Sequence, residues 1–150
     1  MTIHASRKVE QLTKVNYDIL EWVINRMLLL NYKKEFNYDI RVYKSKTHYS
    51  YICLGEIEEP YIIYLNCDKH NINMRYVIST ILHEIRHILQ YTLHHTNMQS
   101  SFKSYREYYN SKEERDARRF EKLTTTVMRT YKALEETKII FNKYQMGTTI

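Results

Sequence analysis

The chain has 150 residues, a length that fits one domain with a single buried core. Hydrophobic residues make up 43% of it, which excludes an intrinsically disordered chain, and its 2 glycines and 1 proline favour long helices over many tight turns. The net charge of +6 permits an acidic partner such as nucleic acid, but lysines and arginines are interleaved with acidic residues in most segments. We therefore interpret the charge mainly as a solvated surface and do not favour nucleic acid as a partner.

The N-terminal segment and the cysteines bear on where the protein works. Residues 1–12 lack the apolar stretch of a signal peptide, and the longest apolar run, Met27–Leu30, is too short to span a bilayer. Cys53 and Cys67 lie in apolar, strand-like runs, which indicates two reduced core thiols and not metal ligands. These features predict a cytoplasmic protein that does not interact with a membrane.

The first half of the chain predicts a helix followed by a sheet. Apolar residues recur at helical spacing from Ser6 to Tyr32, so we expect one long amphipathic N-terminal helix. Gly55 and Pro60 bracket an acidic turn, which predicts a hairpin between the strands on either side. The result is a small, mostly antiparallel sheet of three strands, expected at Tyr38–Tyr43, His48–Leu54 and Tyr61–Leu65.

The second half of the chain predicts mainly helices. Helical spacing returns from Met74 to about Tyr91, and Asn71 or Asn73 can cap the start of this central helix. Residues 93–110 have no clear period and are expected to form a loop with room for a short helix. A last apolar stripe predicts a long C-terminal helix from Ser111 to Lys138 or beyond. Together these elements predict an α+β fold, with the whole chain forming one domain.

The central helix carries the sequence His83-Glu84-Ile85-Arg86-His87, an H-E-x-x-H motif. Residues four apart lie on the same helix face, so His83 and His87 can present two imidazole nitrogens to one ion. Zinc prefers such ligands in tetrahedral geometry and lowers the pKa of a bound water, from which Glu84 could take a proton. The motif therefore predicts a Zn²⁺ centre with Glu84 as the general base.

A catalytic zinc site needs a third protein ligand and an open position for water. Glu114 is the first candidate, because it lies near the start of the last helix and Ala117, a small residue, could let that helix pack closely against the motif helix. Glu113 and Asp116 are its neighbouring alternatives. Ser111-x-x-Glu114 also matches a capping box, in which the Glu114 carboxylate would only bond the start of its own helix.

Two histidines after the motif offer a second candidate for the third ligand. His94 and His95 follow His87 by seven and eight residues. They miss the register of the longer H-E-x-x-H-x-x-G-x-x-H pattern, in which Gln90 would have to be Gly and Leu93 the third His. This disfavours a metzincin. A weak site with no third protein ligand is the remaining alternative.

The pairing of H-E-x-x-H with a later E-x-x-A, Glu114 to Ala117, resembles the gluzincin metallopeptidases. The small size and the element order resemble the minimal zincin-like domains of the ImmA/IrrE-like type. This resemblance covers about residues 61–123. It implies that Glu114 is the third zinc ligand and that the protein hydrolyses peptide bonds in a protein or peptide substrate. The strand at Tyr61–Leu65 would then offer an edge to an extended peptide.

One residue departs from these families, and a second group is also similar. The families often have a small residue, commonly Gly, before the second histidine, where this chain has Arg86; this arginine could pair with Glu114 or Asp116. The SprT-like proteases share a minimal core and act on proteins bound to DNA. They usually use a third histidine, so His94 or His95 would have to serve if that resemblance holds.

Several residues between the two site helices could donate a hydrogen bond to the oxyanion that develops during hydrolysis. They are His94, His95, Tyr105, Tyr108 and Tyr109.

Three functions compete at this point. The leading hypothesis is a zinc metallopeptidase, because Glu84 is intact. The alternative is a catalytically weak or inactive zincin-like protein that binds or regulates a protein or nucleic acid. A helical DNA-binding protein with an accidental motif is the least favoured, since no groove-reading helix is recognisable.

Overall fold

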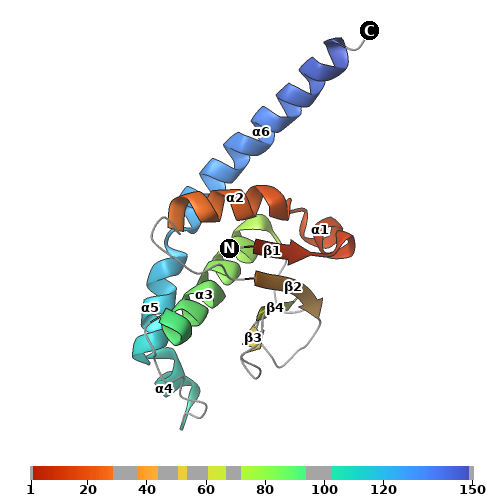
Figure 1. Ribbon diagram of the computed structural model, residues 1–150. Helices are drawn as coiled ribbons and strands as arrows, with labels where there is room; N and C mark the ends of the chain where they lie inside the picture. Colours follow the sequence, from red (N-terminus) through yellow and green to blue (C-terminus); the bar gives the residue numbers. More distant parts are fainter. Residues whose placement is uncertain are drawn as a thin grey trace.

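The structure is a computed structural model and describes residues 2–28, 37–43, 51–53, 61–66, 72–93 and 103–148. It confirms an α+β fold in which helices dominate. Figure 1 shows α3 in the middle of the molecule, with the sheet on one side and α5 on the other, and α6 extending away from the body. The elements are β1 (Thr2–Ala5), α1 (Arg7–Thr13), α2 (Tyr17–Leu28), β2 (Asn37–Tyr43), β3 (Tyr51–Cys53), β4 (Tyr61–Asn66), α3 (Met74–Leu93), α4 (Tyr105–Tyr109), α5 (Lys112–Glu121) and α6 (Thr124–Thr148).

The sheet has the strand order β1-β2-β4-β3. The expected hairpin is confirmed, because β3 and β4 pair antiparallel, but the prediction of a mostly antiparallel sheet of three strands is wrong. β4 lies between β3 and β2 and runs parallel to β2, and residues 2–5 add a fourth strand parallel to β2. Since β4 is paired on both sides, the expectation that Tyr61–Leu65 offers a free edge to a peptide is also wrong. The turn at residues 54–60 lies outside the described residues.

The expected N-terminal helix is two helices, α1 and α2, which form the crossover that the parallel strands β1 and β2 require. The backbone of Lys14 adopts a left-handed conformation with φ 56°, which ends α1. Asn16 then starts α2, because its Oδ1 accepts hydrogen bonds from the N–H groups of Asp18 (3.0 Å) and Ile19 (3.2 Å). The expected part of the helix beyond residue 28 lies outside the described residues.

The apolar face of α3 lies at the centre of the core, as its wide apolar surface predicted. α3 contacts β4, α5 and α6, while α2 covers β1 and contacts α6. On the sheet, Ile40 of β2 pairs with Ile63 of β4, and both side chains are fully buried. The helix residues of this core include Leu20, Val23, Ile24, Val77, Ile78, Ile81, Leu82, Ile85, Ile88, Leu89, Val127 and Tyr131.

The expected C-terminal helix is also two helices, because the chain bends between α5 and α6. The N–H groups of Lys122 and Leu123 bond carbonyls only three residues back, at Arg119 (3.2 Å) and Phe120 (3.1 Å), a tight turn that ends α5. The bend lets α5 follow α3 while α6 crosses to α2. Within the described part of the chain, no helix has the length and apolar character needed to cross a membrane.

We expect Tyr131→Phe to destabilise the fold. The buried Tyr131 hydroxyl accepts a hydrogen bond from the Asn16 N–H at 2.8 Å and so ties α6 to the start of α2; burial raises its pKa to about 12. Loss of the acceptor should lower the free energy of unfolding by about 1–3 kcal/mol in urea denaturation. Tyr105→Phe, at an exposed tyrosine, is the control and should change it by less than about 0.5 kcal/mol. Equal values for the two variants would contradict the assignment.

We expect Lys14→Gly to stabilise the protein. A residue with a Cβ is strained in the left-handed region that Lys14 occupies, and glycine is not. The free energy of unfolding should rise by about 1 kcal/mol. Lys8→Gly is the control, because Lys8 lies within α1 and is exposed; the same substitution should there lower stability by about 1 kcal/mol. A loss of stability in Lys14→Gly would show that the lysine side chain makes a favourable contact.

Candidate metal centre

The H-E-x-x-H motif lies in the middle of α3. Asn73, one of the two caps expected from the sequence, caps this helix, because its Oδ1 accepts a hydrogen bond from the Tyr76 N–H at 2.9 Å. Leu82, Ile85 and Ile88 bury the opposite side of the helix in the core and so fix its rotation. With that rotation set, the histidines of the motif point toward α5.

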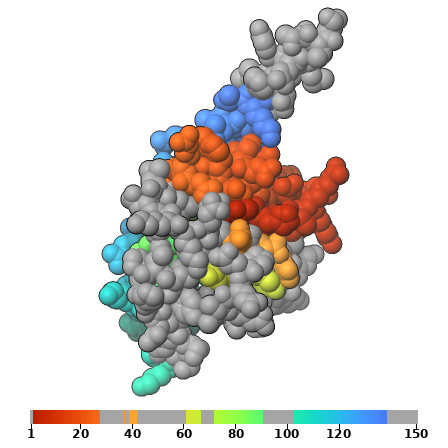
Figure 2. Space-filling model, in the orientation of Figure 1, coloured from red at the N-terminus to blue at the C-terminus, as the bar shows by residue number. Residues whose placement is uncertain are grey.

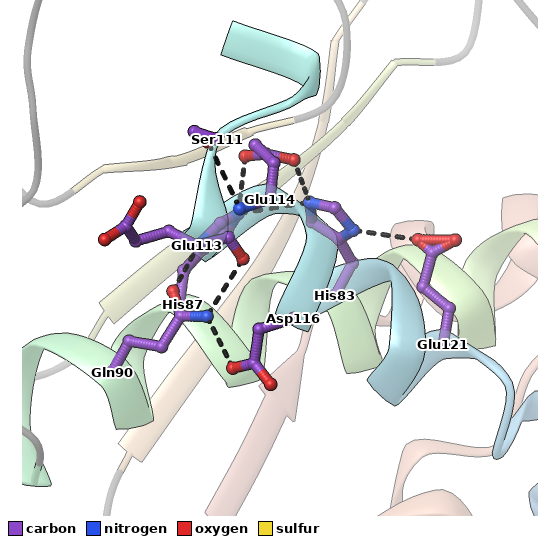
Figure 3. Close-up of polar contacts among 8 residues, drawn as sticks. All are labelled: His83, His87, Gln90, Ser111, Glu113, Glu114, Asp116 and Glu121. Carbon is purple, nitrogen blue, oxygen red and sulfur yellow. Dashed lines mark hydrogen bonds and ion pairs between the residues drawn. The ribbon is translucent and has the colours of Figure 1, made fainter.

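Three side chains from two helices converge at this point (Figure 3). His83 Nε2 lies 3.1 Å from His87 Nε2 and 3.1 Å from Glu114 Oε2, and His87 Nε2 lies 2.8 Å from Glu114 Oε1. In a tetrahedral zinc site with bonds of about 2.0–2.1 Å, ligand atoms are about 3.3 Å apart. The donor atoms of His83, His87 and Glu114 therefore fit one metal ion after a small outward movement.

Glu114 faces the histidines and not the start of its own helix. Ser111 does cap α5, because its Oγ accepts a hydrogen bond from the Glu114 N–H at 3.3 Å. A complete capping box would also bond the Glu114 carboxylate to the Ser111 N–H, but that N–H donates to the carbonyl of Tyr108 at 3.1 Å. The carboxylate is thus left for His83 and His87. Ala117, one turn further along, is fully buried against α3, where the small side chain permits close packing.

The other candidates for a third ligand lie elsewhere or are not described. The backbone carbonyl of Glu113 accepts a hydrogen bond from Gln90, and the Asp116 carboxylate pairs with Arg86. His94 and His95 fall outside the described residues. Among the described histidines, cysteines and acidic residues, only His83, His87 and Glu114 form a group that could hold a metal ion.

Each histidine is held through its other ring nitrogen. His83 Nδ1 lies 2.8 Å from Glu121 Oε2, and His87 Nδ1 lies 3.0 Å from Gln90 Oε1. Sequence reasoning missed both partners, although their spacing carried a signal. Gln90 is three residues after His87 on the same helix face, and Glu121 is two turns after Glu114. These contacts aim both Nε2 atoms at the Glu114 carboxylate.

Arg86, which precedes the second histidine of the motif, pairs with Asp116 and not with Glu114. Its Nε donates to Asp116 Oδ2 at 2.7 Å, one of the two pairings expected from the sequence, and its guanidinium lies over the ring of Phe120. The hydrogen bonds of Asp116 with Arg86 and Gln90 outweigh partial burial and lower its pKa. A large cation next to the second histidine is therefore neutralised by α5.

The charged groups at the centre perturb one another strongly. Burial raises the pKa of Glu84 to about 7, although His83 and His87 act to lower it. Burial favours a protonated Glu114 too, but hydrogen bonds from His83, His87 and Tyr108 outweigh it and hold its pKa well below the usual range. Burial likewise opposes the charged form of His83, whereas its hydrogen bonds to Glu114 and Glu121 raise the pKa to about 10. The site thus concentrates negative charge on Glu114.

Of the three candidate tyrosines on α4, only Tyr108 reaches the centre. Its hydroxyl is hydrogen-bonded to the Glu114 carboxylate, and partial burial together with that bond raises its pKa, although 38% of the residue is exposed. Tyr105 is 63% exposed, and Tyr109 lies under the guanidinium of Arg118, 3.6 Å from the ring centre. The structure therefore brings Tyr108 to the candidate site and leaves the other two at the surface.

Comparison with protein-family models, with curated proteins and with solved structures finds no match for this chain. What this chain does must therefore be inferred from the geometry and chemistry of the centre itself.

Proposed function

We propose that the protein is a gluzincin-type, zincin-like metallopeptidase that binds one Zn²⁺ through His83, His87 and Glu114. The observation that carries this proposal is the convergence of two imidazole Nε2 atoms and one carboxylate at 2.8–3.1 Å, beside a buried glutamate. Three protein ligands leave a position open for water or substrate. When bound, zinc supplies a Lewis acid that polarises a carbonyl oxygen and lowers the pKa of a water molecule.

Glu84 is proposed as the general base and then the general acid. It directly follows His83 on α3, only 7% of it is exposed, and burial raises its pKa to about 7. A carboxyl group with such a pKa can accept a proton from the attacking water and return it to the leaving nitrogen of the peptide. Its proximity to Glu114, whose carboxylate stays ionised, keeps the two acids in different roles.

Tyr108 is proposed as the donor to the developing oxyanion. Its hydroxyl already lies beside the Glu114 carboxylate, and its raised pKa keeps it protonated, as a hydrogen-bond donor must be. Donors of this kind stabilise the negative charge that forms on the substrate oxygen in the transition state. α4 would thus complete a site whose ligands come from α3 and α5.

Metal analysis of the purified protein tests the zinc proposal. We expect about one zinc per chain in the wild type and in Glu84→Gln, because Glu84 is not a ligand, and a large loss in Glu114→Ala. Peptide products from a denatured protein mixture, detected by mass spectrometry, should appear with the wild type and vanish with Glu84→Gln. Glu113→Ala is the control and should retain zinc and activity.

The outcomes separate the competing functions. Wild-type protein without metal would overturn the zinc proposal. Zinc retained without cleavage of any substrate would overturn the proposal of an enzyme. It would favour the binding or regulatory protein, in which the zinc centre would be structural.

We expect Tyr108→Phe to lower kcat/KM roughly 10²-fold with unchanged zinc content, because the hydroxyl is not one of the three proposed zinc ligands. The measurement is cleavage of a peptide identified in the product analysis. Tyr105→Phe removes a hydroxyl from the exposed side of the same helix and should leave kcat/KM within about twofold. A loss of zinc in Tyr108→Phe would instead assign the hydroxyl to positioning Glu114.

A further inference from the structure

A series of hydrogen bonds connects His87 with α5 through residues that no part of the proposed reaction uses. His87 Nδ1 bonds Gln90 Oε1, Gln90 Nε2 bonds Asp116 Oδ2 at 2.8 Å, and Asp116 Oδ2 also accepts from Arg86. Figure 3 shows Gln90 between His87 and Asp116. We call His87, Gln90, Asp116 and Arg86 the positioning network. Gln90 is only 4% exposed, so its polar atoms depend on these partners.

The partners of Gln90 leave its amide only one orientation. The nitrogen Nε2 faces two groups that can only accept, the Asp116 carboxylate and the backbone carbonyl of Glu113 at 3.0 Å. A flipped amide would place an oxygen against both acceptors and remove the Gln90 donor from each of them. The oxygen Oε1 is therefore turned to His87, and Arg86 donates to the same Asp116 oxygen that accepts from Gln90.

The orientation of Gln90 in turn determines which nitrogen of His87 is available. An acceptor at Nδ1 requires that this nitrogen carry the proton, so Nε2 is the nitrogen left to bind a metal. His83 reaches the same result by other means, because its Nδ1 faces the Glu121 carboxylate. One ligand is thus held by a neutral amide and the other by a charged acid, and α5 supplies Glu121 and Asp116 as well as Glu114.

We propose that Gln90 is a positioning residue that holds His87 for metal binding and is itself held by Asp116 and Arg86. The effect on metal affinity depends on the proposed zinc function, whereas the hydrogen bond to His87 does not. Removing such a partner of a metal-binding histidine typically weakens metal binding about 10–100-fold. The two consequences can therefore be measured separately.

The first measurement is NMR of the imidazole protons in metal-free protein. The Nδ1–H of His87 should exchange slowly with solvent in the wild type, because it is buried and bonded to Gln90, and rapidly in Gln90→Leu. His4, whose side chain is exposed, is the internal reference for fast exchange. A His87 proton that exchanges as fast as that of His4 in the wild type would overturn the proposal without any variant. Slow exchange that persists in Gln90→Leu would overturn it as well.

The second measurement is zinc affinity by competition with a chelator. Gln90→Leu should bind zinc about 10–100-fold more weakly, and Gln11→Leu, the same change on the exposed face of α1, should match the wild type. If Gln90→Leu does not fold, Asp116→Ala replaces it, since Asp116 is partly exposed; its zinc affinity should fall by a smaller factor. Unchanged affinity in the folded variant would overturn the proposal.

The two results distinguish this inference from the proposed function. Wild-type protein that binds no zinc, yet loses the slow Nδ1–H signal in Gln90→Leu, would refute the metallopeptidase and retain Gln90 as the residue that orients His87. Tight zinc binding that is insensitive to Gln90 would retain the metal centre and refute the positioning network.

Discussion

The burial of the Glu114 carboxylate between α3 and α5 is the constraint on which the rest of the centre depends. An ionised acid with 5% exposure is costly unless every lone pair finds a donor, and His83, His87 and Tyr108 supply those donors. The same contact needs a close approach of the two helices, which Ala117 permits. The same close packing of α3 and α5 therefore determines both the geometry of the site and the contact between the helices.

The scaffold meets this constraint by dividing the work between its helices. The core fixes one side of α3, so the direction of its histidines does not depend on contacts with α5. α5 is short and ends at a tight turn, and α6 then takes over the contact with α2. The bend at residues 122–123 thus separates the part of the chain that builds the site from the part that secures the fold.

The sequence predicted the local features well and the long-range ones poorly. The motif helix and its Asn73 cap follow from spacing along a helix, which short stretches of sequence encode. The approach of Glu114 joins two helices, and it was expected from the need for a third ligand and from the E-x-x-A pattern that ends at Ala117. Strand direction depends on which strands become neighbours, and the insertion of β4 between β2 and β3 leaves no trace in the pattern of either strand. The helix break at Lys14 comes from a left-handed backbone conformation that lysine does not signal, and the break at residues 122–123 comes from a tight turn. In the sequence, Gln90 stands out only because it replaces the Gly of the longer H-E-x-x-H-x-x-G-x-x-H pattern, although its spacing from His87 indicated a contact.

The short helix α4 gives the two sides of the centre different local stability. None of its five residues is buried, so little apolar packing resists its opening, whereas the histidines sit on a helix whose opposite face lies in the core. Its N-cap Ser104, the bond from Tyr108 to Glu114 and the contact of Arg118 with the Tyr109 ring are among the interactions that hold it in place. Opening of α4 would therefore expose Glu114 to solvent at a fraction of the global free energy of unfolding, while the two histidines keep their positions. Local opening of these five residues would then be separate from unfolding of the core helix α3.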